Sequence, residues 1–216
     1  MVGRLAFAAS VTSAVLASVT ACATTSAQVF HPAGAVPVSS GGQGSGGTAR
    51  VATAPGGYRF PASISVEVAA APAGSSTDSA ILTGYQDYVL ALWAGVASHG
   101  RDSAYHHETS GNASTYVQQE VRYFSRGRTL QGTIRYSALT VTSVFYGDNA
   151  NVTACVDTSG FRVVSASTGT LIGPVFPRIY AHYLEDVSEV RGADGTWFVS
   201  HTGSFPTSTS EGATCR

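Results

Sequence analysis

The spacing of apolar residues changes once along this chain, and that change limits the folds it can adopt. Between residues 79 and 127 the apolar side chains recur every three to four positions, which is the period of a helix packed on a core. From residue 133 to residue 205 they alternate instead, as in strands with one buried face. Helices followed by a run of antiparallel strands favour an α+β domain with the helices on one face of the sheet.

Two helices are expected. The first follows Asp78, a residue type that favours the N-cap, and ends at Gly100. Its apolar stripe consists of Ile81, Tyr85, Tyr88, Leu92 and Val96, widened by Leu82, Val89 and Trp93. The second helix is expected over residues 112–127, with Gly127 as its C-terminal cap. Val117, Val121 and Phe124 form its apolar face.

The alternating part predicts two strand pairs. They cover residues 133–158 and 179–205, with turns at 147–149 and 192–195. Residues 161–177 between them are expected to form an edge strand and a loop. Upstream, Ile64, Val66 and Val68 alternate in a short run that fits either a strand or an extended arm.

This order of elements resembles NTF2-like cone-shaped domains, in the form seen in actinobacterial lipoproteins of unknown function. The resemblance rests on the element order, on the strand carrying NVTACVDTSG, and on the last hairpin with ADGTWFVS followed by a closing cysteine. It implies an α+β fold over residues 77–216, with two N-terminal helices packed on a curved antiparallel sheet. The short third helix that this fold often contains is not evident in the sequence.

The first 21 residues have the features of a secretory signal peptide. Arg4 precedes a stretch of small and apolar residues that is shorter than the roughly 20 needed to span a membrane. Residues 19–22, Val-Thr-Ala-Cys, resemble the bacterial lipobox, whose cysteine is acylated and becomes the mature N-terminus. The alternative is an ordinary signal cut within residues 21–23 or 25–27. We expect the lipobox, which would anchor Cys22 at the extracellular face of the cytoplasmic membrane.

The region after Cys22 contains few large apolar residues. Its Gly/Ser-rich run, SSGGQGSGGTARVATAPGG, cannot bury enough surface to offset the entropy of ordering. Residues 22–57 are therefore predicted to be a disordered tether, and residues 58–76 an extended arm that leads into the domain.

The chain has three cysteines, Cys22, Cys155 and Cys215. An odd number in an exported protein leaves one unpaired. If Cys22 carries lipid, Cys155 and Cys215 remain to form one disulfide; the alternative is two free buried thiols, which an oxidising compartment disfavours.

The composition of the chain limits the kinds of partner that it is expected to bind. Every basic residue is arginine, which indicates a GC-rich genome and an actinobacterial source. The net charge of -1 gives no basic stripe, so nucleic acid is not an expected partner, and no motif calls for a cofactor.

The densest polar cluster lies between the expected helices and consists of His99, Asp102, His106, His107 and Glu108. Neighbouring histidines in a loop usually point apart, and the spacing H-E-x-x-H is absent. We expect a solvated loop and no metal site.

Aromatic residues are the candidates for ligand binding. Tyr85, Tyr88 and Trp93 on the first helix, with Trp197 on the last hairpin, could line a pocket mouth. Aromatic residues at helical spacing also serve as plain core.

Asp186 and His201 are the one candidate catalytic pair. A four-residue turn at 192–195 would set these two residues opposite one another across the last hairpin. A carboxylate facing an imidazole has the geometry of an acid–base pair. The alternative is an ordinary cross-strand pair on a half-exposed face, and a one-residue slip of register would separate the two side chains.

Two classes of function remain. The preferred one is a lipid-anchored extracytoplasmic module, not catalytic, that binds a small apolar ligand or an envelope protein through the cone. The alternative, implied by the resemblance to NTF2-like enzymes, is an isomerase or cyclase with a buried carboxylate or His–Asp pair. A deep pocket with a desolvated acid or histidine favours the enzyme, whereas a filled cone favours the binding module.

Overall fold

A computed structural model describes residues 52–53 and 57–215 of the chain. The predicted signal peptide, the predicted anchor Cys22 and most of the predicted tether lie outside these residues. Ala52–Thr53, which the tether prediction included, form strand β1 and pair antiparallel with β2 (Arg59–Phe60). Within the described part of the chain, no helix has the length and hydropathy to cross a membrane.

Both predicted helices are confirmed, as α1 (Ser76–Ala97) and α2 (Gly111–Phe124). The N-cap of α1 is Ser75 and not Asp78: the Ser75 hydroxyl accepts a hydrogen bond from the Asp78 amide at 3.1 Å. Asp78 lies in the first turn, where its negative charge interacts favourably with the positive end of the helix dipole. The connection between the helices contains a short 3₁₀ turn, η2 (Ala104–His106).

Seven strands form the main sheet. They are β3 (Ile64–Val68), β4 (Arg128–Phe145), β5 (Asn149–Asp157), β6 (Phe161–Ser165), β7 (Leu171–Pro174), β8 (His182–Arg191) and β9 (Trp197–Pro206). The antiparallel order is β7-β6-β4-β5-β8-β9, and β3 pairs with β4 in parallel. Two further 3₁₀ turns are η3 (Arg178–Tyr180) and η4 (Gly212–Cys215).

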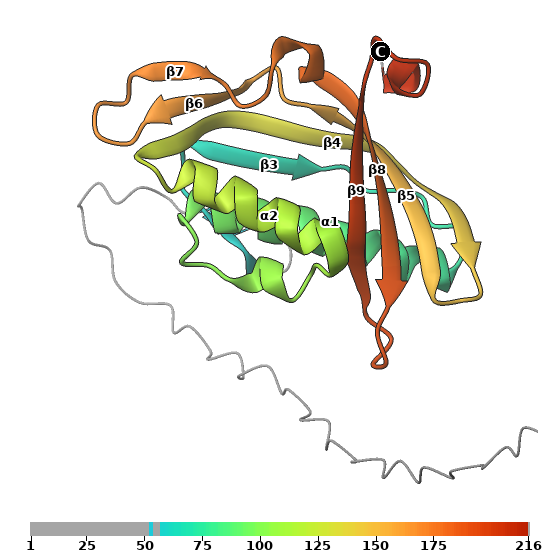
Figure 1. The fold of residues 1–216 in the computed structure, drawn as a ribbon. Coiled ribbons are helices and arrows are strands. Elements are labelled where there is room, and N and C mark those ends of the chain that lie inside the picture. Colours follow the sequence, from blue (N-terminus) through green and yellow to red (C-terminus); the bar gives the residue numbers. More distant parts are fainter. Residues whose placement is uncertain (1–51, 54–56, 216) are drawn as a thin grey trace, which may run out of the picture. The chain divides into compact units, whose positions relative to one another are not determined.

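The predicted α+β class is confirmed, because α1 and α2 pack together against one face of the curved sheet (Figure 1). The run at residues 64–68, which fitted a strand or an arm, is a strand of this sheet. The two predicted hairpins form around their predicted turns, and residues 161–174 form a third hairpin with β7 as the edge strand.

The long strand β4 bends at a bulge that keeps its apolar side chains in the core. Before the bulge the buried residues have even numbers, as in Ile134 and Tyr136; after it Leu139 is buried. The register with β5 shifts between Ser137 and Thr140, and Ala138 within this segment has φ 52°. One extra residue therefore reverses the alternation where the sheet curves.

The predicted disulfide is present. Cys155 on β5 is bonded to Cys215 in η4, with their Cα atoms 5.2 Å apart. The bond fixes the C-terminal segment to the middle of the sheet.

A substitution at Gly132 should show how tightly the strands approach at the point where β3, β4 and β6 meet. Gly132 has φ 102°, and a Cβ atom there would lie 2.1 Å from the carbonyl oxygen of Gly160. Gly132→Ala should therefore lower the free energy of unfolding by about 2–3 kcal/mol, measured by urea denaturation. Gly147→Ala, at φ 79° in an open turn, is the matched control and should cost only about 1 kcal/mol. Equal costs at the two sites would contradict the close approach.

Candidate functional site

Strand β8 carries two carboxyl groups into the interior of the domain, between the sheet and the helices. Its buried residues alternate, and Glu185 and Glu189 lie on the same inward face as Val187. Four residues of strand separate the two glutamates by about 13 Å. On the neighbouring strand β5, Glu185 pairs with Ala154 and Glu189 with Ala150. These small partners leave room for the two carboxyl groups.

Glu185 is held by a tyrosine of α1. The Tyr85 hydroxyl donates a hydrogen bond of 2.5 Å to Glu185 Oε2, and both residues are buried. Burial raises the pKa of Glu185 to about 7, although the hydrogen bond from Tyr85 acts in the opposite direction. Chemically, this carboxyl group could exchange a proton near neutral pH if a substrate reached it.

Aromatic rings fill the space around Glu185. The tyrosine cluster comprises Tyr85, Tyr88, Tyr136 and Tyr183, and none of its members exposes more than 4% of its surface. Trp93 donates a hydrogen bond of 2.8 Å to the Tyr136 hydroxyl, and the Tyr85 ring packs edge-on against Tyr136. The Tyr88 hydroxyl is buried with no hydrogen-bond partner among the described residues. The interior is therefore a packed aromatic core with two acids embedded in it.

Glu189 is more isolated than Glu185. It is fully buried, and neither carboxyl oxygen has a hydrogen-bond partner in the described part of the chain. A Cβ atom at Gly84 of α1 would lie 3.1 Å from Glu189 Oε2 and 2.8 Å from Trp197, so the glycine lets the helix pack closely here. Burial raises the pKa of Glu189 to about 9. The side chain is thus a neutral carboxylic acid at pH 7.

The candidate ligand-binding aromatics occupy two environments. Tyr85, Tyr88 and Trp93 lie in the packed interior and not at a pocket mouth. Trp197 is also buried, but it borders a cleft of about 240 Å³ between α1 and the β8–β9 turn. The helical spacing of the first three residues reflected core packing.

The predicted register of the last hairpin is wrong. Arg191 pairs with Trp197, and a bulge between Ser188 and Glu189 shifts the pairing again, so that Asp186 faces Gly203 and His201 faces Ser188. The structure describes both Asp186 and His201, and no hydrogen bond or ion pair joins them. The His201 Nδ1 atom instead lies 2.5 Å from the side-chain amide of Asn112. The proposed acid–base pair does not form.

The polar cluster between the helices is a structural loop. Asp102 accepts a hydrogen bond from the Ala104 amide, and His99 Nδ1 lies 3.2 Å from the Phe124 carbonyl. His106 and His107 are exposed. Partial burial and the charge of Asp87 raise the pKa of Glu108 to about 7. Among the described residues, no three histidine, cysteine or acidic side chains are placed to hold a metal ion together.

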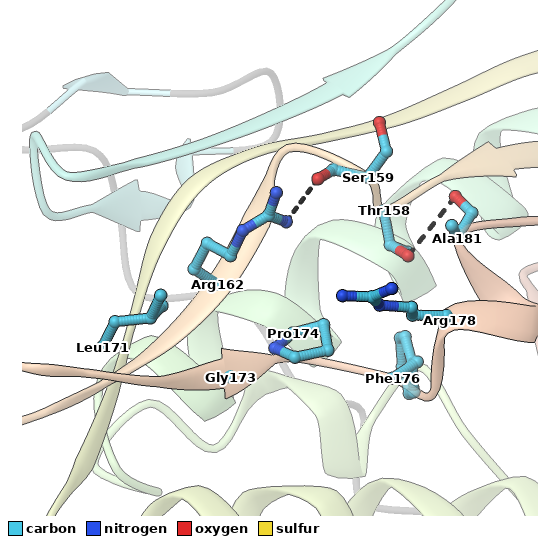
Figure 2. A pocket seen from close by; sticks show the side chains of 9 residues that line it. All are labelled: Thr158, Ser159, Arg162, Leu171, Gly173, Pro174, Phe176, Arg178 and Ala181. Carbon is cyan, nitrogen blue, oxygen red and sulfur yellow. Dashed lines mark hydrogen bonds between the residues drawn. The ribbon is translucent and has the colours of Figure 1, made fainter.

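An open cleft lies beside the filled interior, between the β6–β7 hairpin and η3. Its volume is about 290 Å³, and Figure 2 shows its lining. The lining residues are Thr158, Ser159, Arg162, Leu171, Gly173, Pro174, Phe176, Arg178 and Ala181. Phe176 joins the cleft to the tyrosine cluster, because its ring packs edge-on against Tyr183 at a centroid distance of 6.1 Å. We call this site the arginine cleft.

The comparisons with known proteins add the following. No protein-family model matches the chain, and no curated protein matches its sequence. A provisionally assigned ketosteroid isomerase from Shewanella frigidimarina is 16% identical, with a TM-score of 0.32 over 60% of this chain and 97% of its own. A protein from Catenulispora acidiphila is 12% identical, with a TM-score of 0.41 over 62% and 96% of the two chains.

A third structure, a ketosteroid isomerase-like protein from Erwinia carotovora atroseptica, is 12% identical, with a TM-score of 0.38 over 58% of this chain and 92% of its own. Similarity at these levels carries no conclusion about what this chain binds or does.

Proposed function

We propose that the protein is an exported, lipid-anchored module of an actinobacterial cell envelope that binds a small ligand with an apolar body and does not catalyse a reaction. The observation that carries the proposal is the filled cone beside an open cleft. Glu185 exposes only 5% of its surface behind four buried tyrosines, so a substrate has no route to the one carboxyl group with a neutral-range pKa and a tyrosine partner. The arginine cleft offers apolar surface next to that core.

The isomerase or cyclase alternative is supported by the Tyr85–Glu185 hydrogen bond alone. An acid–base catalyst must come within hydrogen-bond reach of its substrate. Binding at the cleft needs no rearrangement of the aromatic core, and we therefore favour it.

Ligand binding can be tested with N-phenyl-1-naphthylamine, an uncharged dye whose fluorescence rises in apolar surroundings. The protein should bind it, and Phe176→Ser should weaken the binding about tenfold, because the ring forms part of the apolar wall. Tyr123→Ser is the control, since Tyr123 is an exposed aromatic residue of α2 that does not line the cleft. Binding that is unaffected by Phe176→Ser would place the ligand elsewhere.

The anchor has its own test. Cys22→Ser removes the thiol that a lipid would modify, so the variant should move from the membrane fraction to the soluble fraction of cells. Immunoblots of the two fractions measure the change. Ala23→Ser, which leaves the cysteine in place, is the control and should remain with the membrane. A Cys22→Ser protein that stays in the membrane fraction would reject the lipid anchor.

A further inference from the structure

The charged residues that line the arginine cleft are all of one sign. Two of its nine lining residues are arginines, Arg162 and Arg178, and none is acidic. A site with two guanidinium groups and no carboxylate is complementary to an anion.

The two arginines differ in their hydrogen bonding. Arg162 is already positioned, because its Nη1 donates hydrogen bonds to the carbonyl oxygens of Ser159, shown in Figure 2, and of Phe161. Arg178, on η3, is exposed, and its guanidinium has no hydrogen bond or ion pair with any described residue. In Figure 2 its guanidinium points towards the middle of the lining residues. Arg178 is therefore available to bind an anion, and Arg162 adds a fixed positive charge to the same site.

Apart from the two arginines and the hydroxyl residues Thr158 and Ser159, the lining is apolar or glycine. Leu171, which is 61% exposed, lies with Pro174 and Phe176 along the side formed by β7 and the segment after it. Ile179, also 61% exposed, follows Arg178 directly on η3. Large aliphatic side chains exposed beside unpaired positive charge are typical of a site for an amphiphile and not for a simple inorganic ion.

From these observations, we propose that the arginine cleft binds a small organic anion, a carboxylate on a short alkyl or aryl body, with Arg178 on the carboxylate and Phe176 and Leu171 on the apolar part. The volume of about 290 Å³ is at the lower end of ligand-binding pockets, which hold roughly 300–1,000 Å³. It suits a medium-chain carboxylate and is too small for a whole diacyl lipid. This inference rests on the proposed binding function and names the ligand class and residues for it.

Octanoate, 1-octanol and inorganic phosphate separate the parts of the proposal. They are titrated by calorimetry into the full chain carrying Cys22→Ser, so that neither lipid nor detergent competes. Octanoate should bind at least tenfold more tightly than 1-octanol, because only octanoate can form charge-assisted hydrogen bonds with Arg178. Phosphate, which has no apolar body, should bind more weakly than octanoate. Octanoate affinity should fall as salt rises.

Substitutions at Arg178 test whether octanoate binds in the arginine cleft. Arg178→Gln should weaken octanoate binding at least tenfold and leave 1-octanol binding unchanged, whereas Arg178→Lys should retain most of the octanoate affinity. Arg126→Gln is the matched control, because Arg126 is an exposed arginine outside the cleft. Thermal unfolding of each variant checks that it is folded.

Four outcomes would overturn the proposal. Equal binding of octanoate and 1-octanol, or octanoate binding unaffected by Arg178→Gln, would reject the anionic site and leave the apolar binding function standing. Phosphate binding as tight as octanoate binding would reject the amphiphile. If none of these probes and not even N-phenyl-1-naphthylamine binds, the proposed binding function fails as well.

Discussion

Glu189→Gln is expected to remove most of the loss of stability that the protein shows between pH 7 and pH 9. Glu189 is fully buried without a hydrogen-bond partner among the described residues, and its pKa is raised from 4.5 to about 9. The folded protein therefore keeps the proton while the unfolded chain releases it above about pH 4.5. Stability from this group is fully present below that pH and decreases as pH rises towards 9, by up to roughly 1.4 kcal/mol per pH unit.

Glu189 should dominate the loss of stability between pH 7 and pH 9. Glu185 and Glu108 also have raised pKa values, but both are about 7, so most of their contribution is lost below pH 8. Urea unfolding at pH 7, 8 and 9 measures the slope. Glu211→Gln is the control, because Glu211 is exposed and should leave the slope unchanged. A slope in Glu189→Gln equal to that of the wild type would show that the carboxyl group is solvated or paired.

Loss of the disulfide should cost about 4 kcal/mol of unfolding free energy. Cys155 and Cys215 are 60 positions apart, and closing a loop of that length removes this much conformational entropy from the unfolded chain. The double variant Cys155→Ala, Cys215→Ala should show the loss in urea denaturation. Wild-type protein under dithiothreitol should lose a similar amount, and dithiothreitol should not affect the double variant. A loss below about 1 kcal/mol would mean that η4 is held equally well without the bond.

The sequence predicted most of the elements because their periodicity is local. The apolar stripe of α1 and the alternation of β5 depend on residues within one helix or strand, and so do the turns at 147–149 and 192–195. The disulfide followed from counting cysteines.

What could not be predicted depends on irregularities of the sheet. The register shift at Ser188 and Glu189 adds Ser200 as an extra residue on β9, and the small and polar residues 200–204 of that strand have no apolar alternation that would reveal it. The buried acids were missed for a different reason: the assumed hairpin register selected Asp186, whereas Glu185 and Glu189 point inward from the other face of β8. The alternation of Val187 with the two glutamates is the signal that could have identified them.

The arginine cleft also could not be predicted from the sequence. Arg162 is on β6 and Arg178 is on η3, and only the fold of the β6–β7 hairpin brings them to one site. A short edge strand followed by a 3₁₀ turn has no strong periodicity of its own.

The parallel pairing of β3 with β4 has a consequence for the time at which the protein can fold. Ile64 pairs with Gly132. Strand β3 can therefore pair with β4 only after both helices and the start of β4 have been synthesised. Pairing over so long a stretch of chain is slow, because the entropy of closing the loop is lost before the contacts form. Cys155 can form its disulfide only after Cys215 has been synthesised. A chain synthesised from its N-terminus therefore cannot complete this sheet until residue 132 is available, and it cannot close the disulfide until residue 215 is available.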